Sequence, residues 1–253
     1  MKNWEKIKQD LISFLKEEVA KTGLNKVTVG LSGGLDSAVV AILCKEAFGD
    51  NLNCVLMPSQ FSSKSSTDHA IEVCEKFNIK YEIISIEPMV SAFINNMDED
   101  KLRIGNFSAR MRMSVLYDVS SREKSLVVGT SNRSEILLGY GTIFGDIACA
   151  INPIGEIYKS DEFEFAGFLG VPESILGKAP SADLWEGQSD EEELGHTYKE
   201  MDDLLKAMID ENKSKDELLK LGFEEVFIDK ISYRVKANAF KGKLPTIAKI
   251  RWN

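Results

Sequence analysis

The N-terminal segment of the chain shows apolar residues at helical spacing. Five of them recur at intervals of three or four positions, with lysine and glutamate among the residues between: Trp4, Ile7, Leu11, Leu15 and Val19. This spacing places the apolar side chains on one face of a helix. It predicts an amphipathic helix over residues 3–21 that ends at Gly23, because glycine commonly terminates helices.

Short apolar runs then alternate with segments of helical spacing. The runs predict strands, at 26–31, 52–57, 81–86 and 125–130. The segments between them predict helices, at 36–48, 66–77 and 106–122. Strands that are apolar along their whole length are typical of a parallel sheet covered on both faces. The alternation therefore predicts an α/β fold, a doubly wound parallel sheet with helices on both faces.

The pattern changes after residue 180. The stretch "PSADLWEGQSDEEELGHTY" is acidic and rich in turn residues, which predicts a mobile loop over 182–196. Residues 191–239 predict three short helices. No repeat, low-complexity tract or linker separates a second domain, so we expect a single domain over residues 1–253.

Composition and charge exclude several classes of protein. The chain has 253 residues, of which 43% are hydrophobic and 28% charged, as in ordinary globular proteins. Its net charge of −9 disfavours non-specific binding to nucleic acid. The N-terminus is charged throughout, unlike a signal peptide, and no apolar run approaches the roughly 20 residues that cross a membrane. We therefore expect a cytoplasmic protein with no nucleic-acid or membrane partner.

The cysteines argue against a zinc site. Cys44, Cys54, Cys74 and Cys149 are scattered without a CxxC pair, and the chain has two histidines. In a cytoplasmic protein such thiols are not expected to form disulfides. They are predicted to fill the core as small apolar groups.

The segment SGGLDS lies where the first predicted strand becomes a helix. Gly33 and Gly34 allow a tight turn whose amide groups point at an anion. Ser32 and Ser37 add hydroxyl donors, and the positive end of the new helix points to the same place. Asp36 suits magnesium, which is usually held by one or two carboxylates together with phosphate oxygens. A plain strand-to-helix turn is the alternative, which the complete pattern disfavours.

This glycine loop lacks the Gly-Lys-Ser/Thr ending of a Walker-type loop. It resembles the PP-loop of the ATP pyrophosphatases, which have the adenine nucleotide alpha-hydrolase-like fold, split ATP between its α- and β-phosphates and adenylate an oxygen of a second substrate. The segment "GTSNRSE" follows the fourth predicted strand and should lie at the same sheet edge, where such folds bind ligands. The resemblance implies that eight consecutive residues bind ATP: Gly30, Leu31, Ser32, Gly33, Gly34, Leu35, Asp36 and Ser37.

Four further segments narrow the resemblance. They are "GNFSARMRMSVLYD" (105–118), "GTSNRSEILLGYGTIFGD" (129–146), "NPIGEIYKSD" (152–161) and "KAPSADLWEGQSDEEELG" (178–195). Together with the PP-loop they resemble ammonia-dependent NAD synthetase over nearly the whole chain. The resemblance implies that the nicotinate carboxylate of deamido-NAD attacks the α-phosphate of ATP and releases pyrophosphate. Ammonia then attacks the acyl-adenylate, giving NAD and AMP. It also implies a homodimer with the dinucleotide near the subunit interface.

The same resemblance implies roles for residues beyond the loop. Glu135 would share a Mg²⁺ ion with Asp36, and an exposed helix glutamate is the alternative. Thr130, Lys159 and Ser181 would contact ATP, with Lys159 as a point charge on the phosphates. Judged by residue type alone, Thr130 is equally suited to capping a helix and Lys159 to a solvated surface. Ser181 stands where many relatives carry threonine.

Three residues are implied for the second substrate and the second step. Arg110 and Lys241 would contact deamido-NAD, whereas Arg112 is open to a structural role as a salt-bridge partner. Asp146 would lie near the amidation centre, and Asp146 and Lys159 are the two residues expected to be catalytic. Ammonium is not nucleophilic, so the second step needs a proton acceptor or an anion that attracts ammonium. A turn-forming aspartate is the alternative for Asp146.

The sequence departs from longer relatives at three positions. Ile143 replaces a lysine that precedes the aspartate by three residues, and Ala150 replaces a second aspartate four residues beyond it. Leu56 stands in place of an arginine. Some dinucleotide and adenine contacts are therefore expected to differ from theirs.

The acidic loop 182–196 is expected to close over the site and to shield the acyl-adenylate from water; a solvated charged loop is the alternative. A chain of this length leaves no room for a glutaminase domain, so free ammonia or a separate ammonia-supplying partner is expected. An RNA-modifying PP-loop enzyme is disfavoured because paired cysteines and a basic surface are absent. A regulatory nucleotide-binding module would leave Asp36, Glu135, Lys159 and Asp146 without a shared purpose.

Overall fold

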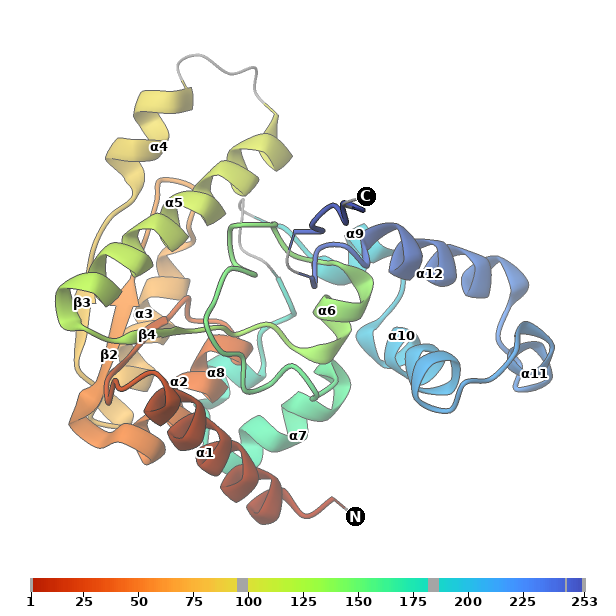
Figure 1. Ribbon diagram of the computed structural model, residues 1–253, viewed down its shortest axis with the longest axis horizontal. Helices are drawn as coiled ribbons and strands as arrows, with labels where there is room; N and C mark the ends of the chain where they lie inside the picture. The colour runs from red at the N-terminus through yellow and green to blue at the C-terminus, as the bar shows by residue number, and fades with distance from the viewer. Residues whose placement is uncertain (1, 95–99, 182–186, 244, 252–253) are drawn as a thin grey trace.

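A four-stranded parallel sheet forms the centre of the computed structural model, which describes residues 2–94, 100–181, 187–243 and 245–251 (Figure 1). The strands lie in the order β3-β2-β1-β4. Their bounds are Val27–Gly30 for β1, Leu52–Leu56 for β2, Tyr81–Ile83 for β3 and Leu126–Val128 for β4. The predicted doubly wound α/β fold is confirmed, and each strand begins within one residue of its predicted start.

The strand order reverses at β1. The chain runs from β1 through β2 to β3 on one side, and β4 then pairs with the other side of β1, with Val27 opposite Leu126. In open parallel sheets the crevice beyond the carboxyl ends of the strands at such a reversal is the usual ligand site. The glycine loop follows β1, and the GTSNRSE segment follows β4, so both lie at this crevice.

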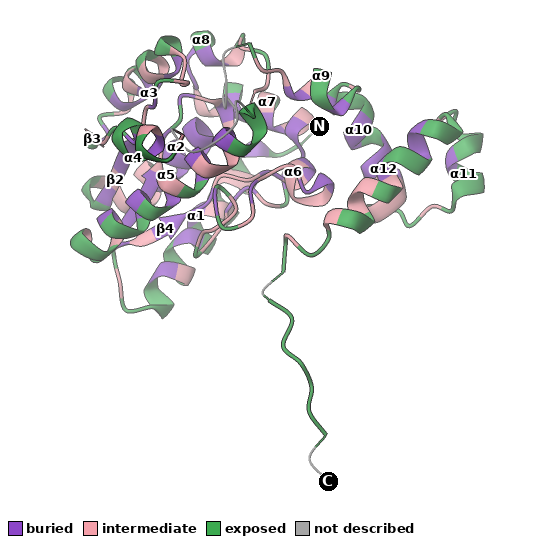
Figure 2. Cartoon of the chain, turned by 90° about the horizontal axis from the view of Figure 1, so that it is seen from above, coloured by how far each residue is buried: buried purple, intermediate pink, exposed green. Residues whose placement is uncertain are grey.

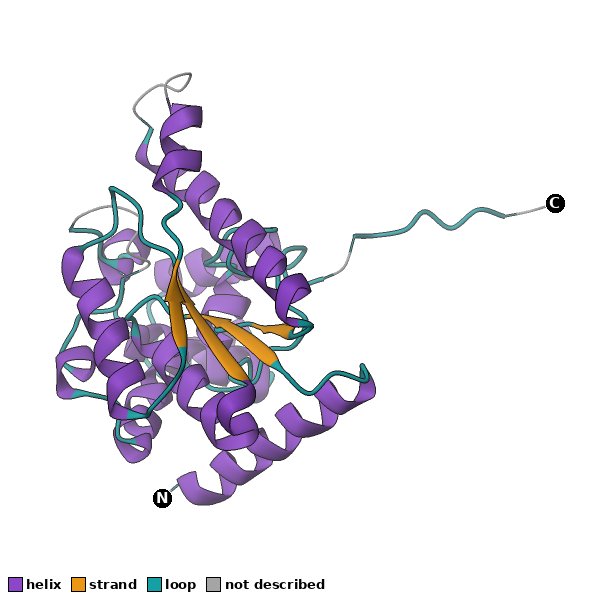
Figure 3. Ribbon diagram, turned by 90° about the vertical axis from the view of Figure 1, so that its left-hand side faces the viewer, coloured by secondary structure: helices purple, strands orange, loops and turns teal. Residues whose placement is uncertain are grey.

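Helices cover both faces of the sheet, as Figure 3 shows. On one face Val29 and Cys54 contact a large core of apolar residues from α1 (Trp4–Lys21), α2 (Leu35–Phe48), α3 (Lys64–Lys76) and α7 (Lys159–Leu169). On the other face Val55 and Val127 contact α4 (Glu87–Ile94) and α5 (Lys101–Glu123). Successive strand residues point to opposite faces, which is why a sheet covered twice needs apolar residues at consecutive positions.

The predicted helices of the first half are confirmed, with small changes in their ends. The helix predicted over 3–21 is α1, Trp4–Lys21, with Asn3 as its cap, and Gly23 after it has a φ of +75°. The helix predicted over 106–122 is longer and begins at Lys101, because the side chain of Asp100 caps it by accepting from the N–H of Arg103 at 3.0 Å. A short 3₁₀ turn, Gly49–Asn51, joins α2 to β2.

The second half contains short helices that the sequence did not predict. They are α6 (Arg133–Leu138) and α8 (Glu173–Leu176), beside the longer α7. The helix α9 (Asp190–Leu194) begins one residue before the range 191–239, over which short helices were predicted. Part of the loop expected over 182–196 is therefore helical, because Ser189 caps α9 and Gly195 ends it at a φ of +77°. Residues 182–186 of that loop lie outside the described residues.

The C-terminal region forms a helical layer of its own beside the sheet (Figure 1). It comprises α10 (Tyr198–Leu205), a π-helical turn (Lys206–Asp210), α11 (Lys215–Lys220) and α12 (Glu225–Asn238). With most of α9, residues 191–239 thus hold four α-helical segments where three were predicted. Met201, Leu204 and Leu205 of α10 are fully buried in this layer together with Leu138 of α6. Residues 245–251 extend away from the body and are exposed (Figure 2).

Among the described residues, no helix combines the length and the apolar character needed to span a membrane. Cys44, Cys54, Cys74 and Cys149 are free thiols, and the first three are buried in the core, as predicted for small apolar groups.

Candidate active site

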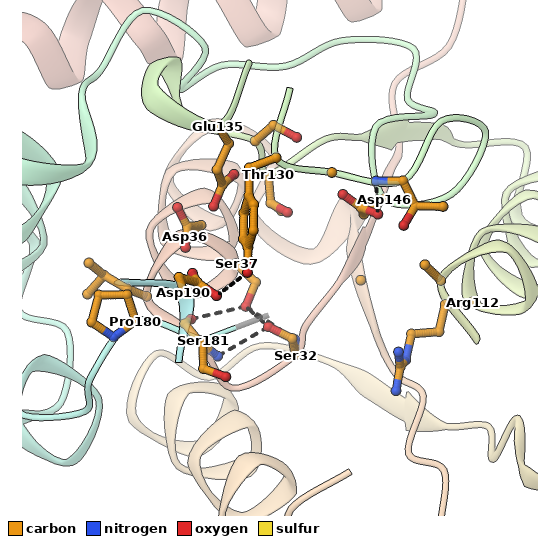
Figure 4. Close-up of a pocket in the computed structure, with 18 of the residues that line it drawn as sticks. Ser32, Asp36, Ser37, Arg112, Thr130, Glu135, Asp146, Pro180, Ser181 and Asp190 are labelled. Atoms are coloured by element: carbon orange, nitrogen blue, oxygen red, sulfur yellow. Dashed lines mark hydrogen bonds between the residues drawn. The ribbon is translucent and has the colours of Figure 1, made fainter. Parts of the chain in front are cut away.

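A pocket of about 570 Å³ opens at the carboxyl ends of β1 and β4 (Figure 4). Its volume falls in the range that holds a nucleotide-sized ligand. Most of the residues singled out in the sequence line it: Gly30, Leu31, Ser32, Gly34, Leu35, Asp36, Ser37, Thr130, Glu135, Asp146, Lys159, Ser181 and Lys241. Residues far apart in the sequence therefore meet at one place, as the predicted topology requires.

The glycine loop is folded tightly around its two serine hydroxyls. Gly33 has a φ of +82°, and a Cβ there would lie 1.9 Å from the carbonyl oxygen of Ser66, so both conformation and space require glycine. Ser37 Oγ accepts from the Ser32 N–H at 3.2 Å and donates to the Gly34 carbonyl at 3.1 Å. Gly34 supplies no side-chain cap to α2. The first N–H groups of α2 are thus left for a ligand at the positive end of the helix.

Asp36, in the first turn of α2, is held by two side chains from other parts of the chain. Lys159 forms an ion pair with Asp36 Oδ2, and the Asn132 amide donates to Asp36 Oδ1 at 2.7 Å. Lys159 also lies 3.7 Å from Glu162 Oε2, which is fully buried. Burial opposes the charge of Lys159, but the carboxylates of Asp36 and Glu162 outweigh it and raise the pKa of Lys159. This lysine therefore remains a cation inside the pocket.

Glu135 lies in the first turn of α6 and forms a reciprocal cap with Asn132. The Asn132 side chain accepts from the Glu135 N–H at 3.0 Å, and Glu135 Oε2 accepts from the Asn132 N–H at 3.2 Å. Burial and the nearby charge of Asp36 raise the pKa of Glu135 well above its usual value. In Figure 4 Asp36 and Glu135 point into the same part of the pocket.

This carboxylate pair fits a divalent ion. The two carboxylates repel one another, and a cation bound between them would stabilise both in the ionised form. No group of three or more His, Cys, Asp or Glu suited to a metal occurs among the described residues. A pair, rather than a full protein cage, suits Mg²⁺, which takes its remaining ligands from phosphate and water.

Asp146 lies at the other end of the pocket, near Arg112 (Figure 4). Its Oδ1 accepts from the Thr142 N–H at 2.9 Å. Although Asp146 is exposed to the pocket, the surrounding walls displace water and raise the pKa of its carboxyl. Lys241 donates to the carbonyls of Gly139 and Gly141 at 2.8 and 3.0 Å, so it holds the loop that precedes Asp146.

The two arginines of α5 differ in place. Arg110 is not among the residues that line the pocket; it is exposed, and its Nε donates to the carbonyl of Ile143 at 3.3 Å. Arg112 does line the pocket and donates to the Met57 carbonyl at 3.1 Å and to Ser62 Oγ at 3.0 Å. Of the three positions expected to differ from longer relatives, Leu56 lines the pocket and Ala150 is exposed.

Several residues at or beside the pocket were not predicted from the sequence. Lys178 donates to Ser66 Oγ at 2.9 Å, beside the glycine loop. Tyr140 OH lies 2.9 Å from Asp190 Oδ1 and 3.0 Å from Glu193 Oε2, and so joins α9 to the pocket wall. Asn132 is not among the residues that line the pocket, but it donates to Asp36; its sequence carried a usable signal, since N-x-x-E is a helix-capping pattern.

Fold and site together define a nucleotide-binding α/β protein with a PP-loop at its topological switch point. Residues 7–245 match the family described as NAD synthase. The NH(3)-dependent NAD(+) synthetase of Wolinella succinogenes is 53% identical over 242 residues, which cover 95% of this chain and 94% of the relative. The enzyme of the same name from Helicobacter pylori is 49% identical, covering 98% and 97%. The chain belongs to the NAD synthase family.

Solved structures agree with this assignment. The NH3-dependent NAD synthetase from Campylobacter jejuni superimposes with a TM-score of 0.84 at 41% identity, covering 98% of this chain and all of that one. NMN synthetase from Francisella tularensis superimposes with a TM-score of 0.88 at 32% identity, covering 99% and 100%. The fold is therefore shared along essentially the full length of both proteins.

Proposed function

We propose that this protein amidates deamido-NAD with ammonia at the expense of ATP, giving NAD, AMP and pyrophosphate through an acyl-adenylate. The observation that carries the proposal is the meeting of the glycine loop with Asp36, Glu135 and Lys159 in one pocket. Relatives at about half identity, matched over nearly their whole length, are named NH(3)-dependent NAD(+) synthetases.

In the first step the chain binds and orients ATP. Backbone amides at residues 32–37, together with the hydroxyls of Ser32 and Ser37, receive phosphate oxygens. Lys159 exchanges its ion pair with Asp36 for phosphate contacts, and Thr130 and Ser181 line the nucleotide side of the pocket. Asp36 and Glu135 would hold Mg²⁺, which when bound stabilises the negative charge of the departing pyrophosphate.

In the second step Asp146 assists the attack of ammonia. Its carboxylate attracts ammonium or accepts a proton as nitrogen attacks the acyl carbon. Replacement of Asp146 by Asn keeps the shape and removes the charge. This variant should form NAD at least tenfold more slowly while still releasing pyrophosphate, and AMP should be released as water in place of ammonia hydrolyses the acyl-adenylate. An equal loss of pyrophosphate release would place Asp146 in adenylation instead.

We further propose a homodimer. Apolar side chains are exposed on α4 and α5, at Met89, Phe93, Leu102 and Tyr117, and Phe93 stacks on Phe107 with 4.1 Å between ring centroids. Burial of such a surface against a second copy would remove it from water. Light scattering on the purified protein measures the mass directly, and a monomer at micromolar concentration would contradict this part.

The test of function is incubation with ATP, Mg²⁺, ammonium and deamido-NAD, with NAD and AMP measured together. Equal amounts of both products are expected. Because NMN synthetase from Francisella tularensis has a closely similar structure, nicotinate mononucleotide is the second substrate to try. A larger kcat/KM for the mononucleotide would reassign the substrate, and tight ATP binding without turnover of either compound would indicate a regulatory module.

A further inference from the structure

A buried carboxylate outside the pocket joins the two helices that carry Glu135 and Lys159. Asp202 lies in α10 and is fully buried. Its Oδ1 accepts from Ser134 Oγ at 2.5 Å, and its Oδ2 accepts from the Ser160 N–H at 2.8 Å. Ser134 directly precedes Glu135 in α6, and Ser160 directly follows Lys159 in α7.

These bonds supply the N-terminal cap that α7 does not make from its own sequence. Its cap residue, Tyr158, forms no side-chain cap. The first two N–H groups of α7 donate elsewhere, that of Lys159 to Ser134 Oγ at 2.9 Å and that of Ser160 to Asp202. An uncapped helix start would leave these donors buried without partners. The negative charge of Asp202 also stands at the positive end of α7, where it is stabilising.

Only a carboxylate serves both donors. Burial raises the pKa of Asp202, while the bonds from Ser134 and Ser160 act against that rise. An ionised carboxylate has acceptor sites on both oxygens, whereas asparagine presents one acceptor oxygen and one N–H₂ donor. With asparagine at 202, an amide nitrogen would face either the Ser134 hydroxyl or the Ser160 N–H. The Ser134 hydroxyl can turn, but the backbone N–H cannot.

We propose that Asp202 is a positioning residue for ATP and metal binding: it fixes the starts of α6 and α7 so that Glu135 and Lys159 both face Asp36. It acts through Ser134 and Ser160 and does not line the pocket. The C-terminal helical layer, through Asp202 of α10, thereby contributes to ATP binding. The inference rests on the proposed function, which supplies the ligand.

Asp202→Asn is the variant that tests this role, and Asp203→Asn is its matched control. Asp203 is the next residue of α10, lies half exposed, and pairs only with Lys199 of the same helix, at 3.0 Å, among the described residues. The probe is α,β-methylene-ATP, which is not cleaved at the bond that breaks, titrated by calorimetry with and without Mg²⁺. Asp202→Asn should weaken binding in Mg²⁺ by about tenfold or more, in line with losing a hydrogen bond to a charged group. Asp203→Asn should bind like the wild type.

Ser134→Ala keeps Asp202 and removes the bridge to Lys159, and it is expected to weaken binding in the same direction. If Asp202→Asn does not fold, Ser134→Ala decides the question. Melting temperatures lowered with unchanged nucleotide affinity in these variants would mean a purely structural role and would overturn the proposal. Because the titrations need no turnover, they remain decisive even if the wild type proves unable to amidate deamido-NAD, an outcome that would refute the proposed function alone.

Discussion

The side-chain amide of Asn132 donates to Asp36 Oδ1 at 2.7 Å and so ties the loop after β4 to the helix after β1. The same side chain accepts from the N–H of Glu135. One fully buried amide thus sets the positions of both carboxylates that we assign to Mg²⁺. Asparagine suits this place because it is donor and acceptor at once and adds no third negative charge.

Replacement of Asn132 by Ala should raise the KM for ATP about tenfold or more, because Asp36 loses a charge-assisted hydrogen bond and α6 loses its cap. Steady-state kinetics with varied ATP measure the effect. Asn53→Ala is the control: Asn53 donates to Glu82 at 3.0 Å from β2, away from the pocket. It should lower the melting temperature while leaving the KM for ATP unchanged. Equal KM values in the two variants would contradict the assigned role of Asn132.

Gly33→Ala should abolish ATP binding, since its Cβ would press into the Ser66 carbonyl and push the loop from its place. Gly170→Ala separates this clash from backbone strain. Gly170 has a nearly equal φ of +79°, but a Cβ there would meet nothing within 4 Å. Its variant should lose about 1–2 kcal/mol of unfolding free energy and keep its nucleotide affinity. Calorimetric titration with α,β-methylene-ATP and thermal melts give both quantities, and retained binding by Gly33→Ala would refute the clash.

Tyr140→Phe should uncouple AMP release from NAD formation. The Tyr140 hydroxyl holds α9 through Asp190 and Glu193, and α9 borders the pocket. A looser α9 admits water, which hydrolyses the acyl-adenylate before ammonia arrives. The ratio of AMP to NAD, near one in the wild type, should rise above it. Tyr233→Phe, which removes an exposed hydroxyl from α12, should leave the ratio unchanged. A ratio of one in both variants would remove the shielding role of α9.

Asp161 should contribute stability that is lost in acid. Burial acts to raise its pKa, but contacts with Lys2 and Lys206 prevail and lower it. A folded-state pKa below the unfolded value of about 3.9 means that the stabilisation is complete above that value and disappears as pH falls through the folded pKa. Asp161→Asn should therefore have a lower free energy of unfolding than the wild type at pH 7, by up to about 1 kcal/mol, and a lower melting temperature.

The melting difference between Asp161→Asn and the wild type should shrink as the pH approaches 2. Asp118→Asn, at an exposed position of α5, provides the baseline for a neutralised surface charge. A difference that stays constant from pH 7 to pH 2 would show that the two lysines do not act through the charge of Asp161.

The sheet and the first helices could be predicted from the sequence because each has a regular apolar pattern. Val27, Val29, Cys54 and Val55 are buried on two different faces, so their strands are apolar throughout and easily found. The helix α7 was missed for the opposite reason. Lys159 and Glu162 are charged yet buried within it, so its polarity does not show which face meets the core. The helix α6 was missed because it is short and its stability comes from its cap and from tertiary contacts.

The residues of the site likewise fall into those that could be predicted from the sequence and those that could not. The residues of the glycine loop form a contiguous motif, and their physical role follows from residue type and position. Lys178 and Asp202 act through contacts with partners far away in the chain, which no local pattern indicates. The N-x-x-E pattern indicates that Asn132 caps a helix, but it does not predict the bond from Asn132 to Asp36. Arg110 and Arg112 are only two positions apart, and which of them faces the pocket depends on how α5 rotates against the sheet.

Because β4 adds to the sheet on the far side of β1, ribosomal synthesis delivers the halves of the phosphate site at very different times. The glycine loop emerges early, Glu135 and Lys159 much later, and Asp202 near the end. A nascent chain that has released only β1–β3 contains the glycine loop but lacks Glu135 and Lys159. Nucleotide affinity should therefore appear only after these residues have been synthesised, and products truncated before Lys159 should be unable to bind ATP.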